Sequence, residues 1–197
     1  MSDLDPQLGA PGTGVVITGG ASGIGLAAAQ ALAAVGRPVA LWDINADGAR
    51  DEAAAITARY GVQACGMAVD LRDPQAVSPA ALATRAALGT IGGFVHCAGT
   101  APTTGIDGVT PDSFDAGMAL HVRAIILLAQ AFREDMRANP GSAIVATASI
   151  NAWFGNGGIP IYTAAKGAVI SLVRSMADEL AADGIRINTV SPGMIDT

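Results

Sequence analysis

A strand, a tight turn and the start of a helix follow one another without a break in Val15-Val16-Ile17-Thr18-Gly19-Gly20-Ala21-Ser22-Gly23-Ile24-Gly25. The β-branched run at the start is typical of a buried parallel strand. An Ala-rich helix is expected over 26–35, because Gly36 ends the apolar pattern. Glycines let the chain turn sharply and let a pyrophosphate approach, and the helix N-terminus offers it N–H groups. These residues predict a dinucleotide-binding unit, with an ordinary glycine-rich turn as the alternative.

Strand and helix patterns alternate along the rest of the chain. Further strands are predicted at 38–42, 62–69, 93–99, 143–146 and 185–190. Helices are predicted at 47–59, 73–88, 111–137 and 161–182, with Asp73-Pro74 beginning the second and Thr110 capping the third. The alternation predicts an α/β fold with a doubly wound parallel sheet, the Rossmann fold, in three αβα layers. Residues 1–13 are expected to form a flexible lead-in, and 14–197 a single NAD-binding domain.

Composition and charge narrow the class of function. The 197 residues are 51% hydrophobic and 14% charged, with 25 glycines and a formal net charge of −6. This acidic balance, without any basic run, argues against nucleic acid and anionic membranes as partners. Only two cysteines occur, without CxxC spacing, so we expect neither a disulfide framework nor a metal site. We find no signal peptide and no unbroken apolar run long enough to cross a bilayer, which favours a cytoplasmic protein.

Tyr162 and Lys166 form the most suggestive pair of reactive side chains. They are four residues apart, and residues with this spacing lie on one face of a helix. An ammonium group beside a phenol favours the phenolate form. A phenol in this setting can give or take a proton during a reaction. The alternative is an ordinary solvated pair on a helix surface.

Asp43 ends the second predicted strand, 18 residues after Gly25. A carboxylate at this spacing can accept hydrogen bonds from both hydroxyls of an adenine ribose, and it would repel a 2′-phosphate. The spacing therefore favours NAD over NADP, with a solvated strand-end Asp as the alternative. Several other candidate residues also fall at carboxyl ends of strands, where such sheets bind ligands: Asp70, Gly99, Ser149 and Pro192-Gly193.

From about Val15 to Thr197, the sequence resembles the short-chain dehydrogenase/reductase family. The motifs that carry this resemblance occur in the order Thr18-Gly19-x-x-x-Gly23-x-Gly25, Asp70-Leu71, Cys97-Ala98-Gly99, Ser149, Tyr162-x-x-x-Lys166 and Pro192-Gly193-x-x-x-Thr197. The resemblance implies reversible hydride transfer between NAD(H) and a small-molecule secondary alcohol or ketone. The alternatives are a catalytically weak NAD-binding sensor or subunit, and an epimerase or dehydratase on the same fold.

The resemblance also implies roles for single residues. Tyr162 would be the general acid/base, Lys166 would favour its phenolate form and hold the nicotinamide ribose, and Ser149 would bind the substrate oxygen. The implied cofactor-binding residues are Gly19, Ser22, Gly23, Ile24, Gly25, Asp43, Asp70, Leu71, Cys97, Ala98, Gly99, Tyr162, Lys166, Pro192, Gly193, Ile195 and Thr197. Because they follow Ser149, Asn151, Trp153 and Phe154 are expected to line the substrate pocket, with packing at the surface as the alternative. Self-pairing of the helices at 111–137 and 161–182 would give a homodimer or homotetramer.

The sequence departs from the family pattern in three places. His96 and Cys97 stand where the family has two Asn, so hydrogen bonds that brace the sheet are expected to change. His121 stands where the family has a catalytic Asn. It is a candidate catalytic residue through its main chain or as a proton-relaying imidazole, and the alternative is a packing residue. Family members also continue beyond Thr197 with a substrate lid and a last strand, so the sequence is expected to be truncated there.

Overall fold

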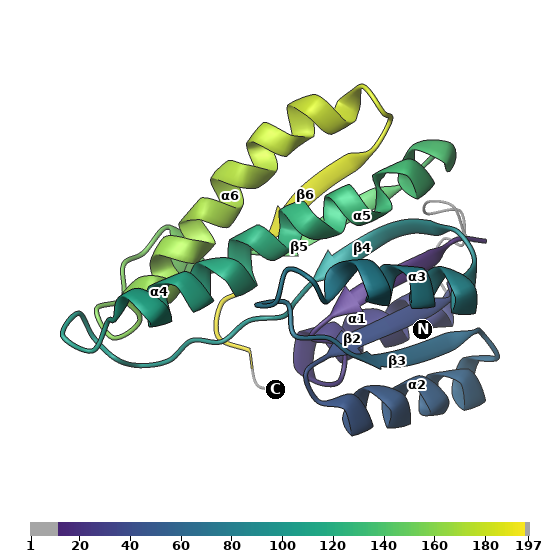
Figure 1. The fold of residues 1–197 in the computed structure, drawn as a ribbon, viewed down its shortest axis with the longest axis horizontal. Helices are drawn as coiled ribbons and strands as arrows, with labels where there is room; N and C mark the ends of the chain where they lie inside the picture. Colours follow the sequence, from purple (N-terminus) through teal and green to yellow (C-terminus); the bar gives the residue numbers. More distant parts are fainter. Residues whose placement is uncertain (1–11, 196–197) are drawn as a thin grey trace.

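The structure is a computed structural model that describes residues 12–195. Within these residues, parallel strands form one sheet in the order β3-β2-β1-β4-β5-β6 (Figure 1). The strands are β1 (Gly14–Thr18), β2 (Val39–Asp43), β3 (Ala64–Ala68), β4 (Ile91–His96), β5 (Ala143–Thr147) and β6 (Arg186–Val190). The predicted parallel sheet is confirmed. Most of the predicted lead-in, and Thr197, lie outside the described residues.

Helices connect successive strands. They are α1 (Gly23–Ala34), α2 (Ala46–Tyr60), α3 (Val77–Leu88), α4 (Pro111–Met118), α5 (Ala124–Ala138) and α6 (Pro160–Ala181). A π-helical turn, η1 (Ala119–Arg123), joins α4 to α5, and a short 3-10 turn, η2 (Ile150–Ala152), follows β5. Thr110 caps α4 as predicted, because its hydroxyl accepts the Ser113 N–H and the Ser113 hydroxyl accepts the Thr110 N–H in return.

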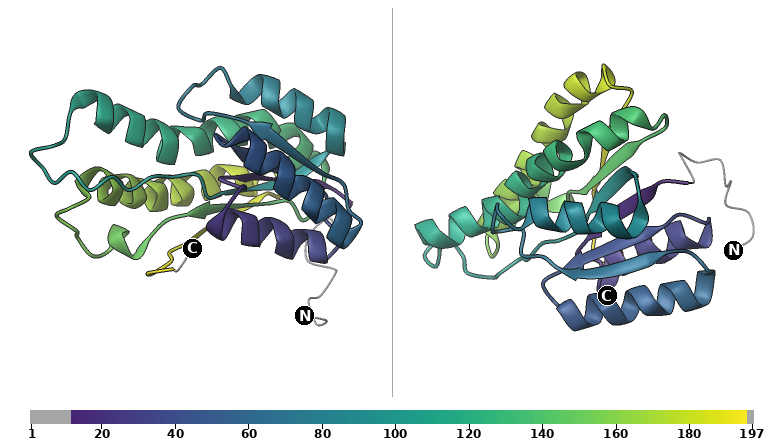
Figure 2. Two further views of the ribbon diagram at one scale, coloured as in Figure 1. Left: turned by 90° about the horizontal axis from the view of Figure 1, so that it is seen from below. Right: turned by 45° about the vertical axis from the view of Figure 1, so that its right-hand side comes forward.

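The central strands are buried on both faces, so alternate side chains enter two different cores. On β1, Val15 and Ile17 pack with residues of α1 and α2. Val16, between them, packs on the opposite face with residues of α3, α5 and α6. The sheet therefore lies between two helical layers, as the Rossmann prediction requires. The views in Figures 1 and 2 show the α4–α5 helix running alongside α6 on one of these faces.

Helix α3 begins later than predicted. Its first residue is Val77, whereas Asp73 and Pro74 belong to the preceding turn, in which the Asp73 carboxylate accepts the Gln75 N–H at 2.9 Å. Pro79 explains the difference. A helix starting at Pro74 would put Pro79 in its second turn, where a missing N–H and the ring would disrupt the hydrogen bonds. Starting at Val77, the helix has Pro79 in its first turn, whose N–H groups need no partner within the helix.

The helix running over 111–138 is, by length and composition alone, apolar enough to cross a membrane, because an 18-residue window within it has a mean hydropathy of 1.3. The sequence prediction that no such segment exists was therefore wrong by this measure. The finding is weak evidence for a membrane span, because buried helices of globular cores meet the same criterion. In this structure Ile125, Leu128 and Phe132 are fully buried against the sheet and its neighbouring helices.

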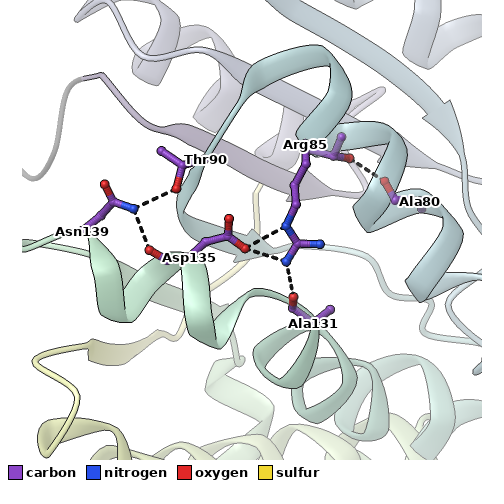
Figure 3. Close-up of polar contacts among 7 residues, drawn as sticks. Ala80, Arg85, Thr90, Ala131, Asp135 and Asn139 are labelled. Carbon is purple, nitrogen blue, oxygen red and sulfur yellow. Dashed lines mark hydrogen bonds and ion pairs between the residues drawn. The ribbon is translucent and has the colours of Figure 1, made fainter.

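An ion pair links α3 to α5 on this same face (Figure 3). The Arg85 guanidinium donates to the Asp135 carboxylate at 2.9 Å and 2.5 Å, and to the Ala131 carbonyl at 2.5 Å. One turn further along α5, Asn139 donates to the Thr90 hydroxyl at 2.8 Å. These contacts hold the ends of the two helices together at the end of the sheet opposite the carboxyl ends of its strands.

Candidate active site

A cavity of about 710 Å³ opens where the strand order reverses, beyond the carboxyl ends of β1 and β4. Ligands of doubly wound sheets bind at this reversal. Of the predicted catalytic and cofactor-binding residues, all that are described line the cavity except Lys166, whose ammonium lies 5.4 Å from the centre of the Tyr162 ring. The lining members are Gly19, Ser22, Gly23, Ile24, Gly25, Asp43, Asp70, Leu71, Cys97, Ala98, Gly99, His121, Ser149, Tyr162, Pro192, Gly193 and Ile195. The fold thus brings together residues from every part of the chain.

The glycine turn after β1 fits a phosphate-bearing ligand. Gly19 has a φ of +66°, which side chains rarely allow. A Cβ on Gly25 would lie 2.1 Å from the Gly19 carbonyl oxygen, so only glycine lets α1 start so close to the turn. Within the described residues the Ser22 side chain makes no capping hydrogen bond. The first N–H groups of α1 are therefore available to a pyrophosphate, with the positive end of the helix dipole behind them.

The Asp43 carboxylate is held in place by the backbone on either side. One oxygen accepts the Ala21 N–H of the glycine turn at 3.1 Å, and the other accepts the Asn45 N–H at 2.9 Å. Asp43 therefore ties the end of β2 to the glycine turn while its carboxylate still faces the cavity. A negative charge fixed at this point suits ribose hydroxyls and disfavours a phosphate in the same place.

Sequence reasoning missed Arg72, which lines the cavity beside Asp70. Its guanidinium donates to both carboxylate oxygens, at 2.6–3.1 Å, and its backbone N–H donates to one of them. These hydrogen bonds hold the pKa of Asp70 below its usual value. The opposite charge two residues after Asp70 was the available signal. The Arg72 carbonyl in turn accepts from Arg123 of η1, which links this loop to the helix across the cavity.

Ser149, Tyr162 and Lys166 come together at the end of β5 and the start of α6. The Lys166 ammonium lies 5.4 Å from the centre of the Tyr162 ring and donates to the Thr147 carbonyl at 2.5 Å. Burial lowers the pKa of Lys166 to about 8. The Ser149 hydroxyl oxygen accepts the Asn151 N–H at 3.1 Å. Because this bond uses a lone pair, the hydroxyl hydrogen can be donated to a ligand in the cavity.

His96 stands where the resemblance leads one to expect an Asn, and both of its ring nitrogens contact groups within the structure. It is 1% exposed, its Nδ1 lies 2.8 Å from the Thr18 hydroxyl, and its Nε2 lies 3.1 Å from the Leu120 carbonyl. A carbonyl can only accept, so Nε2 carries the proton and Nδ1 accepts from Thr18. The imidazole therefore links β1 to the π-helical turn. Burial is the main reason that its pKa falls to about 3.

His121 is also buried, at 1% exposure, and lies between the β4 loop and Tyr162. Its Nε2 is 3.0 Å from the Thr100 carbonyl, and its ring meets the Tyr162 ring edge-on, with centroids 5.5 Å apart. Its Nδ1 has no hydrogen-bond partner among residues 12–195. Burial and the nearby Lys166 charge lower the pKa of His121 to about 4, so the imidazole is neutral at ordinary pH.

Two expectations about the rest of the cavity had different outcomes. Cys97 lines it, and its sulfur accepts from the Thr147 hydroxyl at 3.4 Å, while burial raises the pKa of the thiol. Trp153 and Phe154 do not line it and are 68% and 71% exposed. The prediction for them, and for Asn151, was therefore wrong. The turn η2 begins directly after Ser149. The turn contacts the site through the Asn151 N–H, which donates to the Ser149 hydroxyl, and not through the side chains of Trp153 and Phe154.

Comparison with known proteins agrees with this site. A family model described as enoyl-(acyl carrier protein) reductase matches residues 19–197. A probable galactose dehydrogenase of Rhizobium meliloti is 35% identical over 184 residues, which are 93% of this chain and 72% of the relative. L-Sorbose reductase of Gluconobacter frateurii, solved with NADPH and L-sorbose, has a TM-score of 0.92 at 33% identity, covering 96% of this chain and 72% of its own.

A second solved structure, an NAD⁺-bound xylitol dehydrogenase, has a TM-score of 0.88 at 27% identity and is covered over 73% of its length by 97% of this chain. A Rossmann sheet with these relatives and with this cavity at its strand reversal defines an oxidoreductase. The chain belongs to the short-chain dehydrogenase/reductase family. The relatives themselves differ in cofactor, since the sorbose reductase carries NADPH and the xylitol dehydrogenase carries NAD⁺.

Proposed function

We propose that this protein catalyses reversible hydride transfer between NAD(H) and a secondary alcohol or its ketone. The observation that carries the proposal is that Ser149 and Tyr162 line one cavity with the glycine turn, while the Lys166 ammonium lies 5.4 Å from the centre of the Tyr162 ring. The nicotinamide dinucleotide, when bound, accepts or donates the hydride. Its pyrophosphate would lie at the N-terminus of α1, its adenine ribose at Asp43 and its adenine at Asp70-Leu71.

The protein would supply position and proton transfer. In the oxidative direction the Tyr162 phenolate takes the hydroxyl proton of the alcohol, and in the reductive direction the phenol returns it. The Lys166 ammonium, held by the Thr147 carbonyl, lies 5.4 Å from the centre of the Tyr162 ring and remains charged below about pH 8. Ser149 donates its hydroxyl hydrogen to the substrate oxygen and so fixes that oxygen near Tyr162. The names of the relatives, with galactose, sorbose and xylitol, support a polyhydroxylated substrate for this chain as well.

The proposed preference for NAD over NADP rests on Asp43. Its carboxylate is fixed by two backbone N–H groups, so it cannot easily turn away from a 2′-phosphate. The neighbouring Ile44 side chain is 68% exposed and offers no charge to offset the carboxylate. Arg72, the cation in the cavity lining, is bound to Asp70 at the end of β3. The sorbose reductase carries NADPH. This is compatible with a family in which the end of β2 sets the preference between NAD and NADP.

Calorimetric titration with NADH and NADPH tests the proposal. We expect NADH to bind at least about tenfold more tightly, a difference of about 1.4 kcal/mol. Asp43→Asn keeps the shape of the side chain and removes its charge, so it should bring the affinities for NADH and NADPH closer together. Asp107→Asn, on an exposed loop, should leave both affinities unchanged. Equal or tighter binding of NADPH by the wild-type protein would contradict the assignment of Asp43.

A panel of sugars, polyols and simple secondary alcohols then tests catalysis. Turnover that is lost in Tyr162→Phe supports the enzyme. Tight NADH binding without turnover on any member of the panel would instead favour the catalytically weak sensor or subunit.

A further inference from the structure

We propose that His121 is a positioning residue, an imidazole wedge that fixes the ring of Tyr162 in the site. The inference rests on the proposed function, because it concerns the proton-transferring group of that reaction. His121 contacts surrounding groups in three directions: the Thr100 carbonyl, the backbone of Gly99 and the ring of Tyr162. A side chain held on two sides by backbone can hold a third group in place.

The contact with Gly99 leaves no room for a side chain at that position. A Cβ on Gly99 would lie 2.5 Å from Cε1 of His121 and 3.0 Å from its Nδ1. The imidazole therefore lies directly against the bare backbone of the β4 loop and cannot move further in that direction. On its other side, the Tyr162 ring stands at 84° to it, with ring centroids 5.5 Å apart. This edge-on geometry is favourable for aromatic pairs and adds to the energy of burial.

The π-helical turn brings His121 to this position. Residues 119–123 form a π turn between α4 and α5, and such turns occur often at functional sites. The turn is itself held by His96, whose Nε2 donates to the Leu120 carbonyl, one residue before His121. The wedge is therefore anchored through its backbone as well as through its side chain.

The same contacts argue against a proton relay through His121. A relay needs an exchangeable partner on each ring nitrogen. The Nε2 of His121 lies 3.0 Å from the Thr100 carbonyl oxygen and 3.4 Å from the Thr100 backbone nitrogen, and neither backbone group can pass a proton on. The nearby ammonium of Lys166 further disfavours a charged imidazole. Of the two side-chain roles left open by the sequence, packing against Tyr162 is the one these contacts support.

Three substitutions separate the wedge from the nitrogen chemistry. His121→Phe keeps a ring and removes both nitrogens, His121→Leu keeps most of the volume without a ring, and His121→Ala removes the wedge. We expect His121→Ala to lower kcat by about tenfold or more, with the KM for NAD little changed, because the misplaced group is the proton acceptor. His121→Phe should keep kcat within about threefold of wild type, and His121→Leu should lie between the two.

Asp135→Asn is the control for a general loss of stability. It removes the ion pair with Arg85 at the end of the sheet opposite the site and touches neither His121 nor Tyr162. We expect it to lower the melting temperature while leaving kcat and the KM for NAD unchanged. If His121→Ala lowers the melting temperature but not kcat, or if His121→Phe loses as much kcat as His121→Ala, the positioning role is wrong.

A readout without turnover keeps this test distinct from that of the proposed function. The chain has two tyrosines, so in a Tyr60→Phe background ultraviolet titration of phenolate reports Tyr162 alone. The Lys166 ammonium lies 5.4 Å from the Tyr162 ring, so a displaced phenol senses a different charge environment. We expect His121→Ala to move the titration midpoint by about half a pH unit or more, and His121→Phe to leave it in place. An unmoved midpoint in His121→Ala overturns the inference even if no substrate is found.

Discussion

Acidification from about pH 7 to about pH 5 should destabilise this protein through its two buried histidines, His96 and His121, which are the only ones in the chain. Both are neutral in the folded state, with pKa values lowered to about 3 and about 4, mainly by burial. In the unfolded chain a histidine titrates near ~6.5. A group whose folded pKa is depressed in this way binds its proton more readily when unfolded. Its contribution to stability is complete above about pH 6.5 and is lost as the pH falls towards the folded pKa.

The magnitude follows from these values. At about pH 5 the unfolded chain has taken up nearly one proton at each histidine, about 1.5 pH units below its midpoint, while the folded protein has taken up almost none. Each histidine therefore lowers the free energy of unfolding by about 2 kcal/mol, since one pKa unit corresponds to about 1.4 kcal/mol. Together they should lower it by about 4 kcal/mol, a large part of the stability of a typical domain.

Urea denaturation at the two pH values measures this effect. We expect a loss of about 4 kcal/mol for the wild type, about 2 kcal/mol for His96→Asn or His121→Asn, and little for the double variant, which has no histidine left. Carboxylates contribute mainly below this range, because they titrate near ~4 when unfolded. A wild type with equal stability at both pH values would refute the neutral, buried state of both imidazoles. So would a double variant that keeps the full pH dependence.

Two further predictions concern packing away from the site. Gly66→Ala should lower the free energy of unfolding by about 1–3 kcal/mol, because the new Cβ would lie 2.1 Å from a carbonyl oxygen of α2. Urea denaturation measures this loss. It should find none for Gly155→Ala, because nothing lies within 4 Å of a Cβ at that position. Asp135→Asn should lower the free energy of unfolding by about 1–3 kcal/mol, because the carboxylate is 14% exposed and holds Arg85. Asp47 forms an ion pair in which its carboxylate is 87% exposed, so Asp47→Asn should change the free energy of unfolding by less than about 1 kcal/mol. Equal losses in Asp135→Asn and Asp47→Asn would contradict the claim that the buried ion pair contributes more.

The sheet and most of the site could be predicted because their signals are local. The glycine turn must follow a strand and precede a helix, and both neighbours are adjacent in sequence. Asp43, Asp70 and Ser149 could be placed in one cavity because parallel strands bring their carboxyl ends to the same edge of the sheet. Neither inference required knowledge of which strands are neighbours.

Predictions that depend on a side chain's partner were less successful. The start of α3 depends on Pro79, because proline is tolerated in the first turn of a helix and not in the second. The apparent cap at Asp73 was therefore misleading. Arg72 was missed because opposite charges two residues apart do not by themselves show that the two side chains pair in the cavity lining. Trp153 and Phe154 follow Ser149 in sequence, but the 3-10 turn leaves their side chains exposed. In each case the sequence offered two placements, and packing decided between them.

The histidines show why a family comparison locates a departure more readily than it explains one. Comparison of motifs marks His96 and His121 as unusual, but their contacts are long-range: Thr18 lies 78 residues from His96, and Leu120 lies 24 residues from it. The first contact exists because β1 and β4 are neighbours in the sheet, with Thr18 paired to His96 in register. The second exists because the π turn directs the Leu120 carbonyl towards that pair. An imidazole has two nitrogens on opposite sides of a rigid ring, so His96 can reach both partners at once. The same rigidity in His121, between Gly99 and Tyr162, is what makes it suitable as a wedge.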